Sequence, residues 1–189
     1  MRHIVMTEES YLKQLELADA TEMFWLTDTN RAHLKQWLPW LDFTNRVEDT
    51  AGFIQMTINQ HNNNQGTHYG IWFKGRLAGT LGVHNLDWIN KKTSIGYWLG
   101  AGFQGNGLMT EAVAVYIDKL IFGSWGMEKV TIQAATENWK SRSIPERLGF
   151  QLEGVLRRNE FLYNHYVDHA VYSLLREEWD DFKNEKKLD

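Results

Sequence analysis

Apolar residues follow two different spacings along the chain, and the change from one to the other divides it into predicted elements. Residues 11–17 alternate roughly between apolar and polar, which indicates an edge strand. After them, apolar side chains recur at intervals of three and four, the spacing of a helix with one buried face. This spacing predicts three helices, over residues 20–29, 31–42 and 48–61.

The second of these segments, residues 31–42, contains a proline and two tryptophans. Pro39 lacks the backbone N–H that a helix interior requires, so we expect it to kink or end the helix. Trp37 and Trp40 lie on either side of it. Two interpretations of these rings remain open. They belong to the core, or the kinked aromatic segment forms the wall of a substrate cleft or a subunit contact.

From residue 68 onward the apolar residues form short runs bounded by turn residues, as is typical of strands. These runs predict six strands, over residues 68–73, 77–86, 93–99, 129–136, 150–163 and 167–175, the last two joined by a turn at Asn164 and His165. Helical spacing predicts two more helices, over residues 110–122 and 138–148. The charged tail from Glu177 is expected to be a short helix or a frayed end.

The order of these elements indicates an α/β fold with a mixed sheet. Short turns join the strands over residues 68–99, which therefore form an antiparallel meander. The strand at 129–136 begins after a helical crossover, so it should lie parallel to the strand at 93–99. The predicted architecture is a mostly antiparallel sheet with two parallel strands at its centre and helices on both faces.

The composition narrows the class of protein. The chain has 189 residues, 43% of them hydrophobic, and no linker or repeat, so we predict a single domain over residues 1–189. It has no cysteine, which excludes disulfides, thiolate metal sites and a cysteine nucleophile. A formal net charge of −4 disfavours tight nucleic-acid binding. The N-terminus lacks the apolar stretch of a signal peptide, and no apolar run matches a membrane span, so we expect a cytoplasmic protein.

Four glycines follow the strand that ends at Leu99, and a predicted helix comes directly after them. They are Gly100, Gly102, Gly105 and Gly107. A glycine turn can crowd several backbone N–H groups onto one anion, and a helix start adds further N–H groups and a partial positive charge. The stretch therefore predicts a phosphate-binding site.

Three interpretations of this turn compete. Gly100, Gly102 and Gly105 match the dinucleotide pattern G-x-G-x-x-G, but an antiparallel meander precedes them where a dinucleotide fold has parallel crossover units. The second interpretation is a glycine turn without a ligand. In the third, the phosphate site is shifted along the chain, to a motif that begins at Gln104 and includes Gly107.

In this third register the sequence resembles the coenzyme A pyrophosphate loop of the GCN5-related N-acetyltransferase (GNAT) superfamily. The segment IGYWLGAGFQGNGLMTEA is similar to the branch that acetylates the N-termini of ribosomal proteins. The resemblance continues in the same order through HNLDWINKKTSIGYWL, ENWKSRSIPERLGF and LEGVLRRNEF…YVDHAVYSLLREEW, and it covers residues 11–179. One departure is Met109, where the family pattern prefers glycine or alanine. Backbone N–H donation needs no particular side chain, so we expect the loop to survive, with Met109 at most crowding the pyrophosphate slightly.

The resemblance implies acetyl-coenzyme A as cosubstrate and no metal. It implies that the parallel strands at 93–99 and 129–136 splay apart and that acetyl-coenzyme A enters the gap. Pantetheine amides would pair with the backbone of Tyr97, Trp98 and Leu99, and Asn138 would contact the pantetheine arm. The pyrophosphate would be held by N–H groups of the loop formed by Gln104, Gly105, Asn106, Gly107, Leu108, Met109 and Thr110.

The resemblance also implies an acid and a base. Pro145 stands where many relatives carry a tyrosine that protonates the leaving thiolate, and Ser141 matches the serine that replaces it in the ribosomal branch. The alternative is that Ser141 only bonds the backbone in the first helical turn, and Ser143 is a nearby decoy. Glu160 is the candidate base.

The base assignment has two competitors. Strand alternation would place Glu160 on the same face as Arg158, so a surface ion pair between them is the alternative. His84 is a second base candidate, although a lone histidine is more often structural. No spacing of His, Asp or Glu suggests a metal site.

We therefore predict an acetyltransferase in which the amine attacks the thioester directly. A strand N–H near Trp98 or Leu99 would polarise the thioester carbonyl. The expected acceptor is a protein N-terminus such as that of a ribosomal protein. Its α-amine has a pKa of about 7.7–8.0, so weak base assistance suffices. The alternatives are an acetyltransferase for a small amine (a polyamine or an antibiotic), a non-catalytic acyl-coenzyme A sensor and, last, a nicotinamide-dependent oxidoreductase. We expect no membrane or nucleic-acid partner, and the tryptophan-rich surface permits a homodimer.

Overall fold

Residues 2–186 are described by a computed structural model, and they form two compact units that alternate along the chain. Unit 1 contains the chain up to Val83 and then Gly96–Ala112. Unit 2 contains His84–Ile95 and the chain from Val113 onward. The single domain over residues 1–189 stays a prediction.

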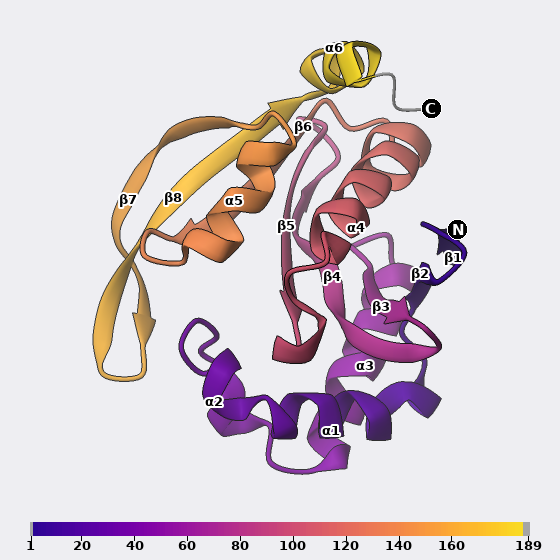
Figure 1. Cartoon of the computed structure of the whole chain (residues 1–189), viewed down its shortest axis with the longest axis vertical. Coiled ribbons are helices and arrows are strands. Elements are labelled where there is room, and N and C mark those ends of the chain that lie inside the picture. The colour runs from indigo at the N-terminus through magenta and orange to yellow at the C-terminus, as the bar shows by residue number, and fades with distance from the viewer. Residues whose placement is uncertain (1, 187–189) are drawn as a thin grey trace. The chain divides into compact units, whose positions relative to one another are not determined.

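The strands form one eight-stranded sheet in the order β1-β2-β3-β4-β5-β6-β8-β7 (Figure 1). They are β1 (His3–Val5), β2 (Ser10–Gln14), β3 (His68–Phe73), β4 (Arg76–Asp87), β5 (Lys92–Leu99), β6 (Lys129–Ala135), β7 (Gln151–Leu162) and β8 (His165–Leu175). The β5–β6 pair is parallel, with Lys92 opposite Lys129 and Ile95 opposite Ile132. The predicted α/β fold with a mixed, mostly antiparallel sheet is confirmed.

The strand predicted over residues 11–17 forms as β2 and ends at Gln14, but the prediction that it is an edge strand is wrong. The short strand β1 pairs antiparallel with β2 on its outer side, with His3 opposite Lys13, while β3 pairs on the other side. Three residues are too few to show a period of two, so the sequence pattern does not reveal β1.

Six α-helices accompany the sheet in residues 2–186. They are α1 (Ala20–Thr29), α2 (Arg31–Leu34), α3 (Val47–Asn62), α4 (Leu108–Tyr116), α5 (Trp139–Arg147) and α6 (Arg176–Lys186). Helices α1 and α3 pack against one another in unit 1. Their buried side chains form a core cluster with those of the neighbouring strands, namely Leu15, Ala20, Met23, Ile54, Trp72 and Leu77.

The predicted helix over residues 31–42 is wrong beyond its first turn. Helix α2 ends at Leu34, and a 3₁₀ turn over Leu41–Phe43 follows Pro39. The irregular segment is held by Arg31, whose guanidinium donates to the carbonyl oxygens of Leu41 and Thr44, each at 2.7 Å. Arg31 therefore joins the start of α2 to the segment that follows Pro39.

The helix that was predicted over residues 110–122 begins at Leu108 and changes its hydrogen-bond pattern after Tyr116. A π-helical stretch continues it over Ile117–Ser124. Its end requires Gly123, because a Cβ there would lie 2.6 Å from the carbonyl oxygen of Asp118. The wider turn aims Asp118 at the C-terminal helix, where it accepts hydrogen bonds from Trp179 Nε1 at 3.0 Å and Lys183 Nζ at 2.7 Å.

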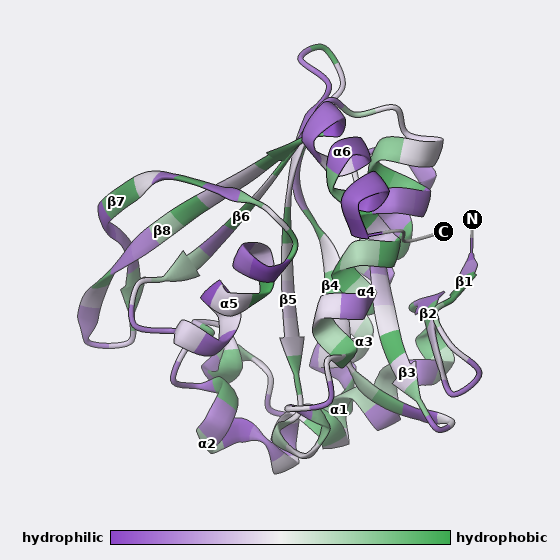
Figure 2. Ribbon diagram, turned by 45° about the horizontal axis from the view of Figure 1, so that its top comes forward, coloured by the Kyte–Doolittle hydropathy of each residue, from purple (hydrophilic) through white to green (hydrophobic). Residues whose placement is uncertain are grey.

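The charged tail forms the regular helix α6, so the frayed alternative is wrong as far as Lys186; residues 187–189 lie outside the described chain. Figure 2 shows α6 as mostly hydrophilic, yet Trp179 is only 2% exposed. Burial by itself would raise the pKa of Asp118, but the hydrogen bonds from Lys183, Trp179 and Lys119 outweigh it and lower the pKa to about 2. An ionised carboxylate thus anchors the helix.

Candidate active site

The residues proposed from sequence fall into two groups, one in each unit. Unit 1 holds residues 97–99 at the end of β5 and the loop of residues 104–110. Unit 2 holds Asn138, Ser141 and Glu160. Each group is held in place by further residues of its own unit, which the sequence analysis did not identify.

The end of β5 lies directly against the backbone of β4. The N–H of Gly100 donates to the carbonyl oxygen of Ala78 at 2.9 Å. A Cβ on Gly79 would lie 2.0 Å from the carbonyl oxygen of Trp98, closer than any side chain allows. A glycine inside a strand is a sequence signal for such an approach. Gly79 therefore sets the path of the strand end that we expect to pair with pantetheine.

Trp98 also answers part of the open question about the aromatic segment. Its ring centroid lies 6.1 Å from that of Trp40, with the planes tilted by 54°. Trp37, Trp40 and Trp98 are all half-buried, so neither tryptophan of the segment is a fully enclosed core residue. The segment after α2 thus packs beside the end of β5, and its interpretation as the wall of a substrate cleft or as a subunit contact stays a prediction.

Two side chains from the N-terminal helices hold the glycine loop, and sequence reasoning missed both. Asn30 ends α1; its Oδ1 accepts from the N–H of Ala101 at 2.8 Å, while its Nδ2 donates to the carbonyl oxygen of Leu26 at 2.8 Å. Gln104 Nε2 lies 2.9 Å from His33 Nε2. An asparagine at a helix end was the only available signal, because these contacts join residues far apart in sequence.

The loop brings backbone N–H groups together at the start of α4. Gly105 and Gly107 have φ of +87° and +74°, a region that side-chain-bearing residues rarely adopt. The first internal hydrogen bond of α4 runs from the N–H of Glu111 to the carbonyl oxygen of Gly107 at 3.0 Å. The N–H groups of Leu108 and Met109 precede it and have no acceptor inside the helix. This arrangement fits a pyrophosphate.

Met109 departs from the family pattern, and the structure shows where its side chain lies. It is only 6% exposed, so it packs into the protein interior. Phosphate binding through the backbone N–H does not require a particular side chain at this position. The crowding expected from Met109 is therefore not supported by its burial.

Replacement of Gly107 by alanine is expected to weaken acetyl-coenzyme A binding by about 5- to 30-fold, because the left-handed conformation costs an alanine about 1–2 kcal/mol. Calorimetric titration with coenzyme A measures the change. Gly102→Ala is the matched control, since Gly102 has no positive φ and a Cβ there meets nothing within 4 Å. Equal loss in both variants, or none in Gly107→Ala, would contradict the assigned cradle.

In unit 2, Asn138 and Ser141 are brought together at the start of α5. Asn138 is the N-cap residue, and its Oδ1 accepts from the backbone N–H of Ser141 at 3.1 Å. Ser141 is half-buried. The hydroxyl of the decoy Ser143 donates to the carbonyl oxygen of Lys140 at 2.9 Å, so it is engaged with its own helix. Pro145 lies inside α5 and is buried.

Arg142 fixes this helix start on the sheet, and it was not predicted. Its Nη1 donates to the carbonyl oxygen of Thr136 at 2.9 Å, and its Nε donates to the Tyr172 hydroxyl at 2.9 Å. The guanidinium also lies 4.3 Å from the ring centroid of Trp139. These contacts join α5 to the residue after β6 and to β8, so the helix start that contains Asn138 and Ser141 is held against the sheet.

The predicted alternation of β7 is broken just before Glu160. Leu156 lies opposite His169 of β8, but Glu160 lies opposite Val167, so three residues of β7 face one residue of β8. Within this bulge Arg158 has φ of +51°. The prediction that Arg158 shares the face of Glu160 through simple alternation is therefore wrong. The carboxylate of Glu160 instead lies 3.5 Å from His169 Nε2.

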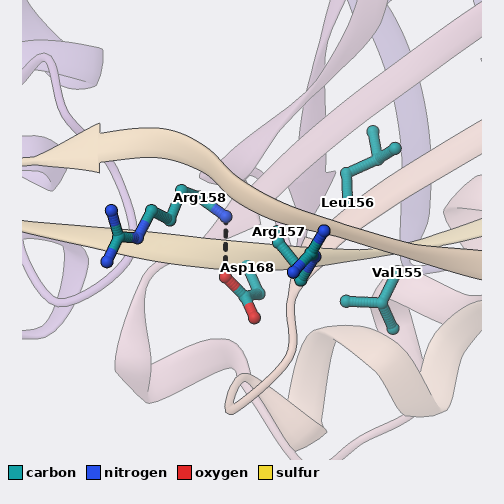
Figure 3. A pocket seen from close by; sticks show the side chains of 5 residues that line it. All are labelled: Val155, Leu156, Arg157, Arg158 and Asp168. Carbon is teal, nitrogen blue, oxygen red and sulfur yellow. Dashed lines mark hydrogen bonds between the residues drawn. The ribbon is translucent and has the colours of Figure 1, made fainter.

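Asp168 stabilises the bulge. Its Oδ1 accepts from the backbone N–H of Arg158 at 2.7 Å (Figure 3). The turn that follows β7 falls on Tyr163 and Asn164, one residue earlier than predicted. An open depression lies beside the bulge, lined by Val155, Leu156, Arg157, Arg158 and Asp168.

His84, the second base candidate, lies near Glu160. The residue is exposed, but the protein around it removes part of its hydration and lowers the pKa of its imidazole, while the Glu160 carboxylate acts in the opposite direction. At neutral pH this favours the uncharged ring, which can accept a proton. The arrangement thus leaves His84 as the second base candidate.

Two negative findings apply to residues 2–186. No cluster of three or more His, Asp or Glu side chains is arranged to hold a metal ion there. In the same range, no helix has both the length and the apolarity to cross a bilayer.

Comparisons with known proteins agree with the mixed-sheet fold. Residues 10–151 match the family model of the acetyltransferase (GNAT) domain. The chain is 34% identical to "Putative ribosomal N-acetyltransferase YdaF" of Bacillus subtilis (strain 168), over 93% of this chain and 96% of that protein. It resembles a structure of the microcin C7 self-immunity acetyltransferase MccE in complex with acetyl-CoA and AMP, with 32% identity, 90% and 94% coverage and a TM-score of 0.86.

A second solved structure has the same fold. It is RimL, a ribosomal L7/L12 alpha-N-protein acetyltransferase in complex with coenzyme A, at 26% identity and a TM-score of 0.88, over 92% of this chain and 97% of that chain. The family model matches most of the chain, and the B. subtilis relative is similar in sequence as well as in length. The chain therefore belongs to the GNAT family of acetyltransferases.

Proposed function

We propose that this acetyltransferase moves the acetyl group of acetyl-coenzyme A to the N-terminal α-amine of a protein, such as a ribosomal protein. The main support for acetyl-coenzyme A as the acetyl donor is the glycine loop with the start of α4. These segments present backbone N–H groups that can bind a pyrophosphate. The names of the YdaF and RimL relatives support the acceptor.

In this proposal the cosubstrate is held largely by backbone groups. Residues 104–110 bind its pyrophosphate, the backbone of residues 97–99 pairs with the pantetheine amides, and Asn138 contacts the pantetheine arm. Acetyl-coenzyme A supplies an activated acetyl group on a thioester. The chain's own task is to orient it and to manage two protons.

Glu160 and Ser141 are the residues proposed to act in the transfer step. The amine nitrogen forms a bond to the thioester carbon and gives up a proton to the Glu160 carboxylate, directly or through a water molecule. The C–S bond breaks, the Ser141 hydroxyl donates a hydrogen bond to the departing sulfur, and solvent supplies the proton that completes the thiol. Because the chain has no cysteine, the attack is direct, without a cysteine acyl-enzyme.

Ser141→Ala is expected to lower kcat by about tenfold, because a neutral hydrogen bond to the departing sulfur is worth about 1 kcal/mol or more. Single-turnover acetyl transfer at saturating cosubstrate measures it. Ser143→Ala is the matched control in the same helix and should keep the wild-type rate. The acid assignment fails if the two variants have equal rates.

The acceptor is tested by incubating the enzyme with isotope-labelled acetyl-coenzyme A and intact ribosomes or a cell extract. Mass spectrometry of intact and digested proteins then locates the label. We expect it on an N-terminal α-amine. Label on lysine side chains alone would contradict the proposal, and no label on any amine would indicate an acyl-coenzyme A sensor.

One observation favours a small-molecule acceptor as the alternative. The MccE structure, with 32% identity, contains AMP beside acetyl-CoA. A parallel reaction with polyamines, amine-containing antibiotics and amines that carry an AMP group distinguishes the two. Acetylation of one of these small amines, without label on any protein N-terminus, would establish the alternative.

A further inference from the structure

The bulge in β7 brings together two side chains that a regular strand would separate. Asn159 and Glu160 are sequence neighbours, so in a regular strand they would point to opposite faces. Both nevertheless contact the ring of His169 on β8: Asn159 Nδ2 lies 3.1 Å from Nδ1, and Glu160 Oε2 lies 3.5 Å from Nε2. The bulge, pinned by Asp168, therefore creates this three-residue arrangement.

The partners of Asn159 determine where the His169 proton lies. The Asn159 Nδ2 also donates to Gln133 Oε1 on β6, at 3.3 Å. An amide nitrogen only donates, so with the Asn159 amide in this orientation Nδ1 of His169 accepts from it. A neutral imidazole with an accepting Nδ1 carries its hydrogen on Nε2, the atom that faces Glu160.

Within this group the His169 ring is the most enclosed part, whereas Asn159 and Gln133 are exposed. The side chain of His169 is 14% exposed and that of Glu160 is 30% exposed. The ring is thus held between the amide of Asn159 on one side and the carboxylate on the other, while the carboxylate retains access to solvent. Sequence reasoning identified Glu160 but gave no signal for His169, because the contact depends on the bulge.

We infer that His169 is a positioning residue that donates its Nε2–H to the Glu160 carboxylate and holds it in the orientation needed to accept the amine proton. Gln133 and Asn159 keep the imidazole in the required tautomer. This inference rests on the proposed role of Glu160 as the base. It goes beyond that role because it assigns a tautomer and a chain of three supporting side chains across β6, β7 and β8.

The kinetic test compares His169→Leu with His169→Gln. Leucine removes the donor, and we expect kcat to fall by about tenfold while KM for acetyl-coenzyme A stays unchanged. Glutamine can place an amide N–H near the position of Nε2, so it should restore most of the rate. His165→Gln is the control, because His165 lies at the exposed start of the same strand. Circular dichroism and melting temperature verify that all variants fold.

A double-mutant cycle separates this inference from the proposed function. If His169 acts through Glu160, His169→Leu should have little further effect in a Glu160→Gln background. Independent, multiplying effects would overturn the inference and leave the base assignment intact. A full loss in Glu160→Gln with a normal rate in His169→Leu would do the same. A normal rate in Glu160→Gln would instead refute the base assignment.

A spectroscopic readout tests the tautomer without any acetyl transfer. Nitrogen-15 NMR of histidine-labelled protein should show a protonated Nε2 and an unprotonated Nδ1 for the signal that His169→Gln removes. Asn159→Asp replaces the donor by an acceptor, so we expect Nδ1 of His169 to become protonated. An Nδ1–H tautomer in the wild-type protein would overturn the inference.

Discussion

Glu160→Gln is expected to lower kcat by about 10²–10⁴-fold, the range that a general base contributes. Glutamine keeps the size of the side chain but cannot accept the amine proton. Single-turnover transfer from acetyl-coenzyme A to the identified acceptor measures the change. Coenzyme A binding should be unaffected, because its proposed contacts lie in residues 97–99 and 104–110 and at Asn138 and Ser141.

The control for this prediction is Glu153→Gln on the same strand. Glu153 forms an ion pair with Lys129 at 2.6 Å and has no proposed role in proton transfer. Its loss should cost at most about 1 kcal/mol of stability and leave kcat unchanged. If Glu160→Gln retains the wild-type rate, His84→Gln becomes the decisive variant, because His84 is the second base candidate.

Gly79→Ala is expected to lower the free energy of unfolding by about 2–3 kcal/mol and to weaken coenzyme A binding. The added Cβ would lie 2.0 Å from the carbonyl oxygen of Trp98, and a backbone atom cannot move aside as a flexible side chain does. The end of β5 would have to shift, together with Gly100 and the loop after it. Denaturant unfolding and calorimetric titration measure the two effects.

Gly52→Ala is the opposite case and serves as the control. Gly52 lies inside α3, has no positive φ, and a Cβ there meets nothing within 4 Å. Alanine should stabilise this helix by about 0.5–1 kcal/mol and leave binding unchanged. A Gly79→Ala protein as stable as the wild type would show that β4 does not constrain the end of β5.

Local sequence signals were sufficient where a residue acts on its own neighbours in the chain. The glycine loop is such a case, since left-handed backbone at Gly105 and Gly107 follows from their lack of a Cβ. Asn138 and Ser141 are another, because an N-cap bonds a residue three positions later. The crossover rule likewise predicted that β5 and β6 are parallel.

Prediction failed where distant residues decide the local conformation. The helix expected over residues 31–42 ends early because Pro39 interrupts it and Arg31 binds the carbonyl oxygens of the segment that follows. The alternation expected in β7 fails because Asp168, on the neighbouring strand, stabilises a bulge. Neither bond can be read from a pattern of apolar and polar positions.

The glycine loop illustrates the division between the two kinds of information. The sequence by itself determined its backbone conformation and its place between a strand and a helix, because both depend on adjacent residues. Only the tertiary structure decided what holds it. Asn30 and His33 bind the loop, and the missing side chain of Gly79 leaves room for the end of β5, the strand that precedes the loop. The same is true of Glu160, whose partner His169 comes from a different strand. Such contacts depend on register and close approach between segments distant in sequence, which no local spacing encodes.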